Sequence, residues 1–287
     1  ISDGNAAPKT TFGGNGSSTG QLYNPVDVEL DSSGNIFVVE EGNDRIQKFD
    51  NTGSYSALIE NGTSATLNAP SAIVLDNDGD LHIANTNDNS LVKMDTMELV
   101  AGTGPLKSNS TLHTTIGTGN LAGTVAYTST NSSGATLATD TQNNKVIIYD
   151  EHGMGVTAST VASPVGIAQN STGFIFVAQN ATNTIKILHP DGSDTGDELG
   201  GDLNFGNLEG LTIDSSDNIV VVDKGHDSID DAEIVKISQN ETVLLNVTGF
   251  TAPRDVVVDP SGNIYATEAN SGNVTKLDST GTQIWSI

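Results

Sequence analysis

One unit recurs along this chain, and the copy at residues 252–287 shows it most clearly. Its apolar segments are rich in β-branched residues or alternate apolar with polar side chains, as β-strands do. Pro260, Gly262 and Gly272 separate these segments at positions typical of tight turns. The unit is therefore predicted to be an antiparallel sheet of four short strands, which needs neighbouring units to bury both of its faces.

Five earlier stretches align with this copy, namely residues 24–60, 69–100, 120–156, 163–193 and 207–245. The residues just before the first strand of each unit are spaced by 45, 51, 43, 44 and 45 positions, and they are Pro25, Pro70, Leu121, Pro164, Leu208 and Pro253. A period in the forties with four strands per unit is typical of propeller blades. We predict an all-β fold, a six-bladed β-propeller with four-stranded antiparallel blades over residues 24–287, preceded by an N-terminal extension over residues 1–23.

A sequence signature accompanies the repeat and reads Pro-x-x-Val-x-x-Asp-x-x-Gly-Asn-Ile-Tyr/Phe in residues 25–50 and 253–278. In this signature the chain resembles the NHL-repeat family of β-propellers. The resemblance implies the fold and leaves the function open, because the family includes lyases, lactonase-like hydrolases, sensors and binders of RNA or protein. The repeated aspartates sit where turns need them, so we predict a turn role for Asp31, Asp76, Asp214 and Asp259.

The charge balance is strongly acidic, with 11 Lys and Arg against 36 Asp and Glu and a formal net charge of −25. This argues against nucleic acid and anionic membranes as partners, since phosphate binding needs a basic surface. No apolar run approaches the ~20 residues of a membrane span. Cysteine is absent, lysine is scarce, and Ser, Thr, Asn and Gly are abundant. We therefore expect an extracellular or cell-surface protein, and Ile1 in place of Met indicates a removed leader or a fragment.

Acceptor sequons for N-glycosylation recur along the chain. They begin at Asn15, Asn61, Asn109, Asn131, Asn170, Asn180, Asn240, Asn246 and Asn273. In an exported protein we predict that some of them carry glycans.

An acidic stretch after the fourth repeat matches the oxygen ligands and the glycine of a calcium loop in part. Gly196 occupies the turn position, whereas Leu199 stands where a ligand is usual, and no helices are predicted on either side. The alternative is a solvated acidic loop. The candidate calcium ligands are Asp191, Ser193, Thr195, Asp197 and Asp202.

The mouth of the central channel is the natural site in a propeller, and the starts of the first strands supply Asp27, Glu209, Arg254 and Asp255. Lactonase-like propellers hold a catalytic calcium there, and Glu209-Gly210 resembles the start of that pattern. The other expected ligands are absent at equivalent places. Arg254 would bring a fixed positive charge near the metal. An ion pair between Arg254 and Glu209 across adjacent blades is the alternative to a metal site.

We therefore predict a non-enzymatic extracellular module for structure, self-assembly or binding, at a cell surface or in an extracellular filament. Its partners would be further copies of itself, other surface proteins or glycans, and no cofactor is predicted apart from possible calcium. The alternative is a calcium-dependent enzyme of the lactonase or lyase kind at the channel mouth. The N-terminal extension is predicted to act as a clasp on the ring or as a strand between subunits. The longest insert, residues 101–119, is predicted to be a loop or a hairpin on one rim.

Overall fold

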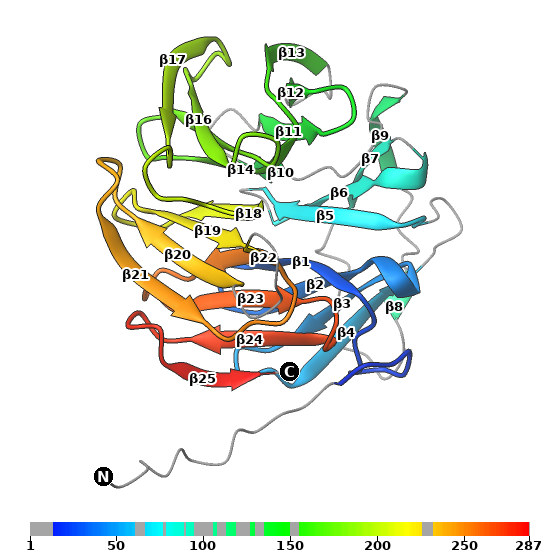
Figure 1. Ribbon diagram of the computed structural model, residues 1–287. Helices are drawn as coiled ribbons and strands as arrows, with labels where there is room; N and C mark the ends of the chain where they lie inside the picture. The colour runs from blue at the N-terminus through cyan, green and yellow to red at the C-terminus, as the bar shows by residue number, and fades with distance from the viewer. Residues whose placement is uncertain are drawn as a thin grey trace, which may run out of the picture.

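The chain folds into sheets that surround a central axis (Figure 1). The computed structural model describes residues 14–60, 67–76, 79–88, 90–94, 106–107, 113–118, 127–129, 135–149, 155–225 and 232–286. The described residues form six sheets, five with four strands and one with five. Two short 3-10 helices, η1 (Glu41–Asn43) and η2 (Thr86–Asp88), are the helical elements of this part of the chain. The predicted six-bladed, all-β propeller is confirmed.

Each blade is built from strands that follow one another in the chain, with the inner strand first. Blade 1 consists of β1 (Pro25–Leu30), β2 (Ile36–Glu40), β3 (Arg45–Phe49) and β4 (Tyr55–Glu60), and blade 2 of β5 (Pro70–Leu75), β6 (Leu81–Asn85), β7 (Ser90–Met94) and β9 (His113–Thr118). Blade 3 consists of β10 (Tyr127–Ser129), β11 (Thr136–Asp140), β12 (Lys145–Tyr149) and β13 (Gly155–Thr160), and blade 4 of β14 (Pro164–Gln169), β15 (Ile175–Gln179), β16 (Thr184–Leu188) and β17 (Asp194–Leu199). Blade 5 consists of β18 (Leu208–Ile213), β19 (Ile219–Asp223), β20 (Glu233–Ile237) and β21 (Val243–Thr248), and blade 6 of β22 (Pro253–Val258), β23 (Ile264–Glu268), β24 (Asn273–Leu277) and β25 (Gln283–Ser286).

The hydrophobic core lies between the blades rather than in one central mass. The second strand of each blade is buried along its whole length, as expected for a sheet covered on both faces. Six apolar clusters fill the six seams between neighbouring blades. The seam between blades 6 and 1, for example, contains Phe49, Tyr265 and Trp285. Packing between blades therefore holds the ring together.

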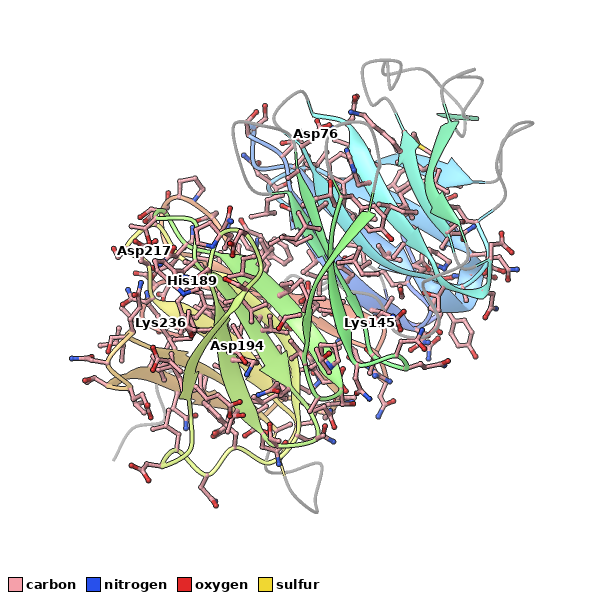
Figure 2. The ribbon with its side chains drawn as sticks, turned by 90° about the horizontal axis from the view of Figure 1, so that it is seen from above. Asp76, Lys145, His189, Asp194, Asp217 and Lys236 are labelled. Carbon is pink, nitrogen blue, oxygen red and sulfur yellow. The ribbon has the colours of Figure 1, made fainter. Side chains whose placement is uncertain are left out.

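The turn after the inner strand is fixed by its aspartate, as predicted. Asp214 accepts hydrogen bonds from the backbone amides of Ser216 and Asn218, and from the Asn218 side chain. A lysine of the third strand, Lys236, then pairs with the same carboxylate at 2.5 Å (Figure 2 labels Lys236). The same arrangement occurs in the pairs Lys48–Asp31 and Lys93–Asp76. The turn is thereby tied to a strand two positions away in the sheet.

A buried polar residue at the end of the second strand anchors the loop that enters the blade. Its side chain accepts a hydrogen bond from the amide two residues before the inner strand. These pairs are Glu40 with Tyr23, Asn85 with Asn68, Gln179 with Ala162, Asp223 with Gly206 and Glu268 with Thr251. Because a buried polar group needs a partner, each pair fixes where its inner strand begins.

The described part of the N-terminal extension, residues 14–23, lies against blades 1 and 6. Arg45 of β3 donates to the carbonyls of Ser17, Ser18 and Gln21, while its Nε pairs with Glu40 at 2.6 Å. A side chain at Gly272 in blade 6 would meet the carbonyl of Leu22, so the two segments touch there. Residues 14–23, called the clasp below, therefore contact both blades within the chain, whereas residues 1–13 lie outside the described residues and a strand between subunits stays a prediction.

The insert at 101–119 is more regular than predicted. Its second part, His113–Thr118, forms β9, the outer strand of blade 2. Its first part, β8 (Leu106–Lys107), pairs in parallel with β4 and adds a fifth strand to blade 1 (Figure 1). The prediction of a rim loop or hairpin was wrong for these residues, because two neighbouring sheet edges recruit them. No helix in the described part of the chain is long and apolar enough to span a membrane.

Candidate functional site

The inner strands begin with an irregularity that turns side chains toward the axis. The register shifts in β1 between Pro25 and Asp27, in β18 between Leu208 and Leu211, and in β22 between Pro253 and Val256. Inner strands β5 and β14 show the same shift near their starts. A β-bulge bends its strand and re-aims the residues within it. The predicted residues Asp27, Glu209, Arg254 and Asp255 all fall within or beside these bulges.

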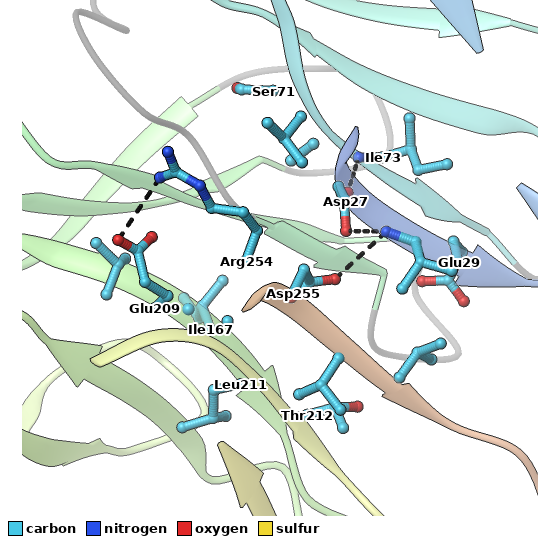
Figure 3. Close-up of a pocket in the computed structure, with 18 of the residues that line it drawn as sticks. Asp27, Glu29, Ser71, Ile73, Ile167, Glu209, Leu211, Thr212, Arg254 and Asp255 are labelled. Carbon is cyan, nitrogen blue, oxygen red and sulfur yellow. Dashed lines mark hydrogen bonds and ion pairs between the residues drawn. The ribbon is translucent and has the colours of Figure 1, made fainter. Parts of the chain in front are cut away.

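A cavity of about 330 Å³ opens where the inner strands converge (Figure 3). Inner strands of blades 1, 2, 4, 5 and 6 line it. Its walls combine apolar side chains such as Val26, Ile167 and Leu211 with carboxylates and one guanidinium. The backbones approach closely there, because a Cβ on Gly166 would meet the amide of Leu211 at 2.5 Å. All four residues predicted for the channel mouth line this cavity.

Glu209 and Arg254 face each other across the cavity (Figure 3), as the ion-pair interpretation predicted. Their closest atoms, Glu209 Oε1 and Arg254 Nη1, lie 3.7 Å apart. Lys224, which the sequence reasoning missed, binds the same carboxylate oxygen at 2.5 Å. Its signal in the sequence was its place directly after Asp223 at the end of the second strand. Two positive charges beside Glu209 do not fit a calcium ion at this position.

The carboxyl groups of Asp27, which is buried, and Asp255, which is half-buried, form a pair in the same cavity. They come from the neighbouring inner strands β1 and β22, and Asp27 is only 7% exposed. Asp27 accepts hydrogen bonds from the backbone amides of Val28 and Ile73, and Asp255 Oδ2 lies 3.5 Å from the same Val28 amide, so the two carboxyl groups converge on one N–H. Burial raises the pKa of both carboxyl groups, and the Asp255 charge raises the pKa of Asp27 further. The pair therefore holds a proton more firmly than an exposed aspartate does.

Glu29 adds a third carboxyl group to the cavity wall, two residues along the same strand. It accepts a hydrogen bond from the backbone amide of Leu30 at 3.0 Å. Burial raises the pKa of Glu29 to about 8, and the nearby Asp255 charge acts in the same direction. No sequence signal pointed to this group, because its importance depends on which face of β1 is turned toward the axis.

The predicted calcium ligands do not converge. Residues Asp194–Leu199 form β17, an extended outer strand, so the loop interpretation was wrong for this segment. Asp191 is engaged by the amide and hydroxyl of Ser193, and the Thr195 hydroxyl donates to the carbonyl of Ile187. Asp197 lies on the exposed strand and Asp202 in the following turn. Among the described residues, no group of three or more His, Cys, Asp or Glu side chains is able to hold a metal ion.

The sequons differ in accessibility. Asn15, Asn240 and Asn246 are exposed and Asn273 is half-buried, whereas Asn61, Asn109 and Asn131 lie outside the described residues. Asn170 is buried, and its Oδ1 accepts bonds from Thr172 and Phe174 to form the turn of blade 4. Asn180 donates through Nδ2 to Asn207 and to the carbonyl of Leu208. The folded protein therefore has no room for glycans at Asn170 and Asn180, and glycosylation elsewhere stays a prediction.

Comparisons with known proteins identify the fold and not the family. No family model matches the chain, and no curated protein sequence matches it. Among solved structures, virginiamycin B lyase from Staphylococcus aureus is similar with a TM-score of 0.64 and 13% identity, covering 92% of this chain and 84% of that one. A gluconolactonase from Xanthomonas campestris has a TM-score of 0.68 and 12% identity, covering 90% and 86%.

A third similar structure belongs to a binding protein. The nidogen/laminin complex contains a chain with a TM-score of 0.66 and 16% identity, covering 85% of this chain and 89% of that one. At such identities the likeness extends to the propeller fold alone. Similar propellers thus include enzymes and a partner-binding module, and membership in the NHL-repeat family stays a prediction.

Proposed function

We propose that this propeller is a binding and assembly module without chemistry of its own, acting at a cell surface or in an extracellular filament. The outer strands carry the proposal. Large exposed apolar side chains lie on the outer strands of three consecutive blades, with Val243 and Leu244 on β21, Ile284 on β25 and Tyr55 on β4. On β21 two such side chains are adjacent in the sequence, at the outer edge of the sheet of blade 5.

Blade 1 supports strand addition as the mode of contact. The short strand β8 comes from an insert outside blade 1 and pairs in parallel with β4 through Ile59 and Leu106. An outer edge of this propeller thus accepts an added strand. In the described part of the chain, β21 and β25 end their sheets with no strand beyond them. Free edges of this kind recruit strands from other chains.

The occupant that we propose for β21 is a strand from a second copy of the chain. A contact between unlike surfaces of identical subunits propagates into a fibre unless it closes a ring. The net charge of −25 per copy opposes such stacking at low salt, and salt screens that repulsion. We therefore expect assembly to increase with ionic strength.

The test is sedimentation velocity at 0.05 and 1 M NaCl. The variant Val243→Lys/Leu244→Lys places two charges on β21, and the control Gln239→Lys/Asn240→Lys places the same charges in the exposed turn before it. We expect wild type and control to form large species at high salt and the β21 variant to remain monomeric. Deletion of residues 1–11 tests whether that segment supplies the strand. A monomeric wild type at high salt, or equal assembly of both lysine variants, contradicts the proposal.

The enzyme alternative is tested on the same protein. The channel-mouth set of Glu209, Lys224 and Arg254 does not fit the calcium that this alternative requires. We expect no calcium-dependent hydrolysis of lactones or esters, and no effect of Glu209→Gln on assembly. Calcium-dependent turnover that Glu209→Gln abolishes would restore the enzyme interpretation.

A further inference from the structure

The seam between blades 6 and 1 differs from the other seams in its connectivity. Elsewhere around the ring, neighbouring blades are consecutive in the chain, whereas this seam joins the last blade to the first. Non-covalent contacts alone hold it: the apolar cluster around Tyr265 and Trp285, the clasp at residues 14–23 and the contact between β1 and β22. Because no chain segment connects blade 6 to blade 1, a weakened contact at this seam favours opening of the ring.

Asp27 and Asp255 lie on the inner side of this seam and connect three blades. Asp27 belongs to β1, and its Oδ2 accepts a hydrogen bond from the amide of Ile73 on β5 in blade 2. Asp255 belongs to β22 in blade 6, and its Oδ2 lies 3.5 Å from the amide of Val28 on β1. Because both carboxyl groups are directed at the amide of Val28, the two side chains lie side by side. A single carboxyl pair thus joins the inner strands of blades 6, 1 and 2 (Figure 3).

Two carboxyl groups that converge on one amide favour a proton shared between them. A hydrogen bond between two carboxyl groups exists only when one of them is protonated, because an ionised carboxylate has no hydrogen to donate. Two carboxylates at this distance repel each other strongly in a desolvated cavity. Gly210 of blade 5 lies directly against Asp255, since a Cβ added there would overlap Asp255 Oδ1.

We propose that the Asp27–Asp255 carboxyl pair is a proton-dependent latch that closes the ring on its inner side. With one shared proton it joins β22 to β1 and, through Ile73, to β5. When that proton leaves, the two carboxylates repel each other and β1 separates from β22 along the cavity. The latch adds to the proposed assembly function and does not depend on it, because it concerns the inner strands and not the outer edges.

The surrounding charges strengthen this behaviour. Glu29 and Glu209 act on the pair from β1 and β18 and favour the protonated form. The positive charges nearby, on Arg254 and Lys224, are directed at Glu209. Glu41 lines the cavity after β2, and β5 contributes Ser71 and Ile73, which carry no charge. The acidic groups therefore predominate around the pair.

The sign of the pH effect follows. An unfolded aspartate loses its proton near pH 4, while the folded pair keeps one to a higher pH because its pKa is raised. Stability due to the proton is therefore complete below about pH 4 and decreases as the pH rises through the folded pKa. The pKa of Glu29 is raised to about 8, so Glu29 also makes stability decrease with rising pH. Its contribution must therefore be eliminated by substitution before the pair is tested.

The experiment measures melting temperature from pH 5 to pH 9 in a Glu29→Gln background. We expect the melting temperature of this parent to fall by roughly 5 °C over the range. Asp255→Asn in the same background keeps a hydrogen donor toward Asp27 and removes the Asp255 charge that raises the pKa of Asp27, so its melting temperature should fall less than that of the parent, with burial of Asp27 as the cause of the remaining decrease. The control Asp191→Asn, in an exposed turn, should follow the parent. Equal slopes for the parent and Asp255→Asn overturn the proposal.

A second measurement needs no variant at the pair. The carboxyl carbons of Asp27 and Asp255 are followed by ¹³C NMR in the wild type, together with hydrogen exchange at the amides of Val28 and Ile73. We expect the pair to keep one proton to a higher pH than an exposed aspartate does, and both amides to lose protection at the pH where that proton leaves. Two carboxyl carbons that titrate near pH 4, or amides whose protection is unchanged when the proton leaves, contradict the latch.

Discussion

At the scale of single residues, the aspartate after the inner strand connects three parts of a blade. Asp214 fixes its own turn through backbone amides and receives Lys236 from the third strand. Lys236 lowers the pKa of Asp214, as do its hydrogen bonds from Asn218 and Ser216, although burial acts in the opposite direction. Few positive charges are available in this chain, and several of them serve this contact.

We predict that Asp214→Ala lowers the free energy of unfolding by about 2–4 kcal/mol at pH 7, because it leaves Lys236 and two turn amides without their partner. The loss should diminish below about pH 4, since a lowered pKa stabilises the fold only above the unfolded value. Urea unfolding at pH 7 and pH 3 measures it. Asp278→Ala is the matched control, because Asp278 makes the same turn contacts without a lysine. A similar loss for both variants would contradict the role of Lys236.

At the scale of the strand, the inner strands meet at a spacing that excludes side chains at particular positions. Gly210 in the bulge of β18 lies against Asp255, and a Cβ there would also meet the carbonyl oxygen of Arg254 at 2.9 Å. Both strands belong to packed sheets and neither is free to move aside. The glycine is therefore required by the close approach of blades 5 and 6.

We predict that Gly210→Ala lowers the free energy of unfolding by about 2 kcal/mol or more, because the added methyl group overpacks a rigid contact. Gly201→Ala is the control, since Gly201 has no atom within 4 Å of its added Cβ and lies outside the left-handed region. The control should change stability by less than about 1 kcal/mol. Thermal and urea unfolding provide the measurement, and an equal response of both variants contradicts the close approach.

The strands and turns were largely predictable because their signals are local. Asp259, Gly262 and Asn263 specify a turn wherever they lie, and Ile264–Glu268 reads as a strand without knowledge of its neighbours. The segment at 194–199 was mistaken for part of a calcium loop, because its spacing of oxygens is also compatible with a strand. Pairing with Thr184–Leu188 decided between the two, and that pairing is a tertiary property.

At the scale of the whole molecule, the ring closes through residues that precede the first blade. Leu22 is fully buried in the seam between blades 6 and 1, although it belongs to the extension and not to a strand. Arg45 holds the neighbouring carbonyls of Ser17, Ser18 and Gln21. The extension is thus part of the ring structure, at least from residue 14 onward.

We predict that Leu22→Ala lowers the free energy of unfolding by about 2–5 kcal/mol, as for a buried leucine in any core. Leu244→Ala, at a leucine that is 50% exposed, should cost less than about 0.5 kcal/mol. Chemical unfolding monitored by the fluorescence of Trp285, which lies in the same seam, reports the effect directly. A negligible loss for Leu22→Ala would mean that the seam closes without the clasp.

The candidate site was predictable in part. Counting from the start of each repeat placed Asp27, Glu209, Arg254 and Asp255 at the axis, and the structure brings them to one cavity. Their partners were not predictable, because Asp27 binds a backbone amide and Lys224 reaches Glu209 across a bulged strand. Such contacts depend on strand register and on the position of the β-bulge, and neither can be predicted from a single sequence.

Each entering loop is anchored by a buried residue of its own blade, and this affects how the sequence can evolve. In the blades where the described residues include both partners, the contact never crosses to a neighbour. A substitution in one blade therefore leaves the anchoring of the others intact, and the anchor differs from blade to blade, with Glu40, Asn85, Gln179 and Asp223 in the same role. Lineages built in this way keep their architecture long after their sequences have ceased to look alike.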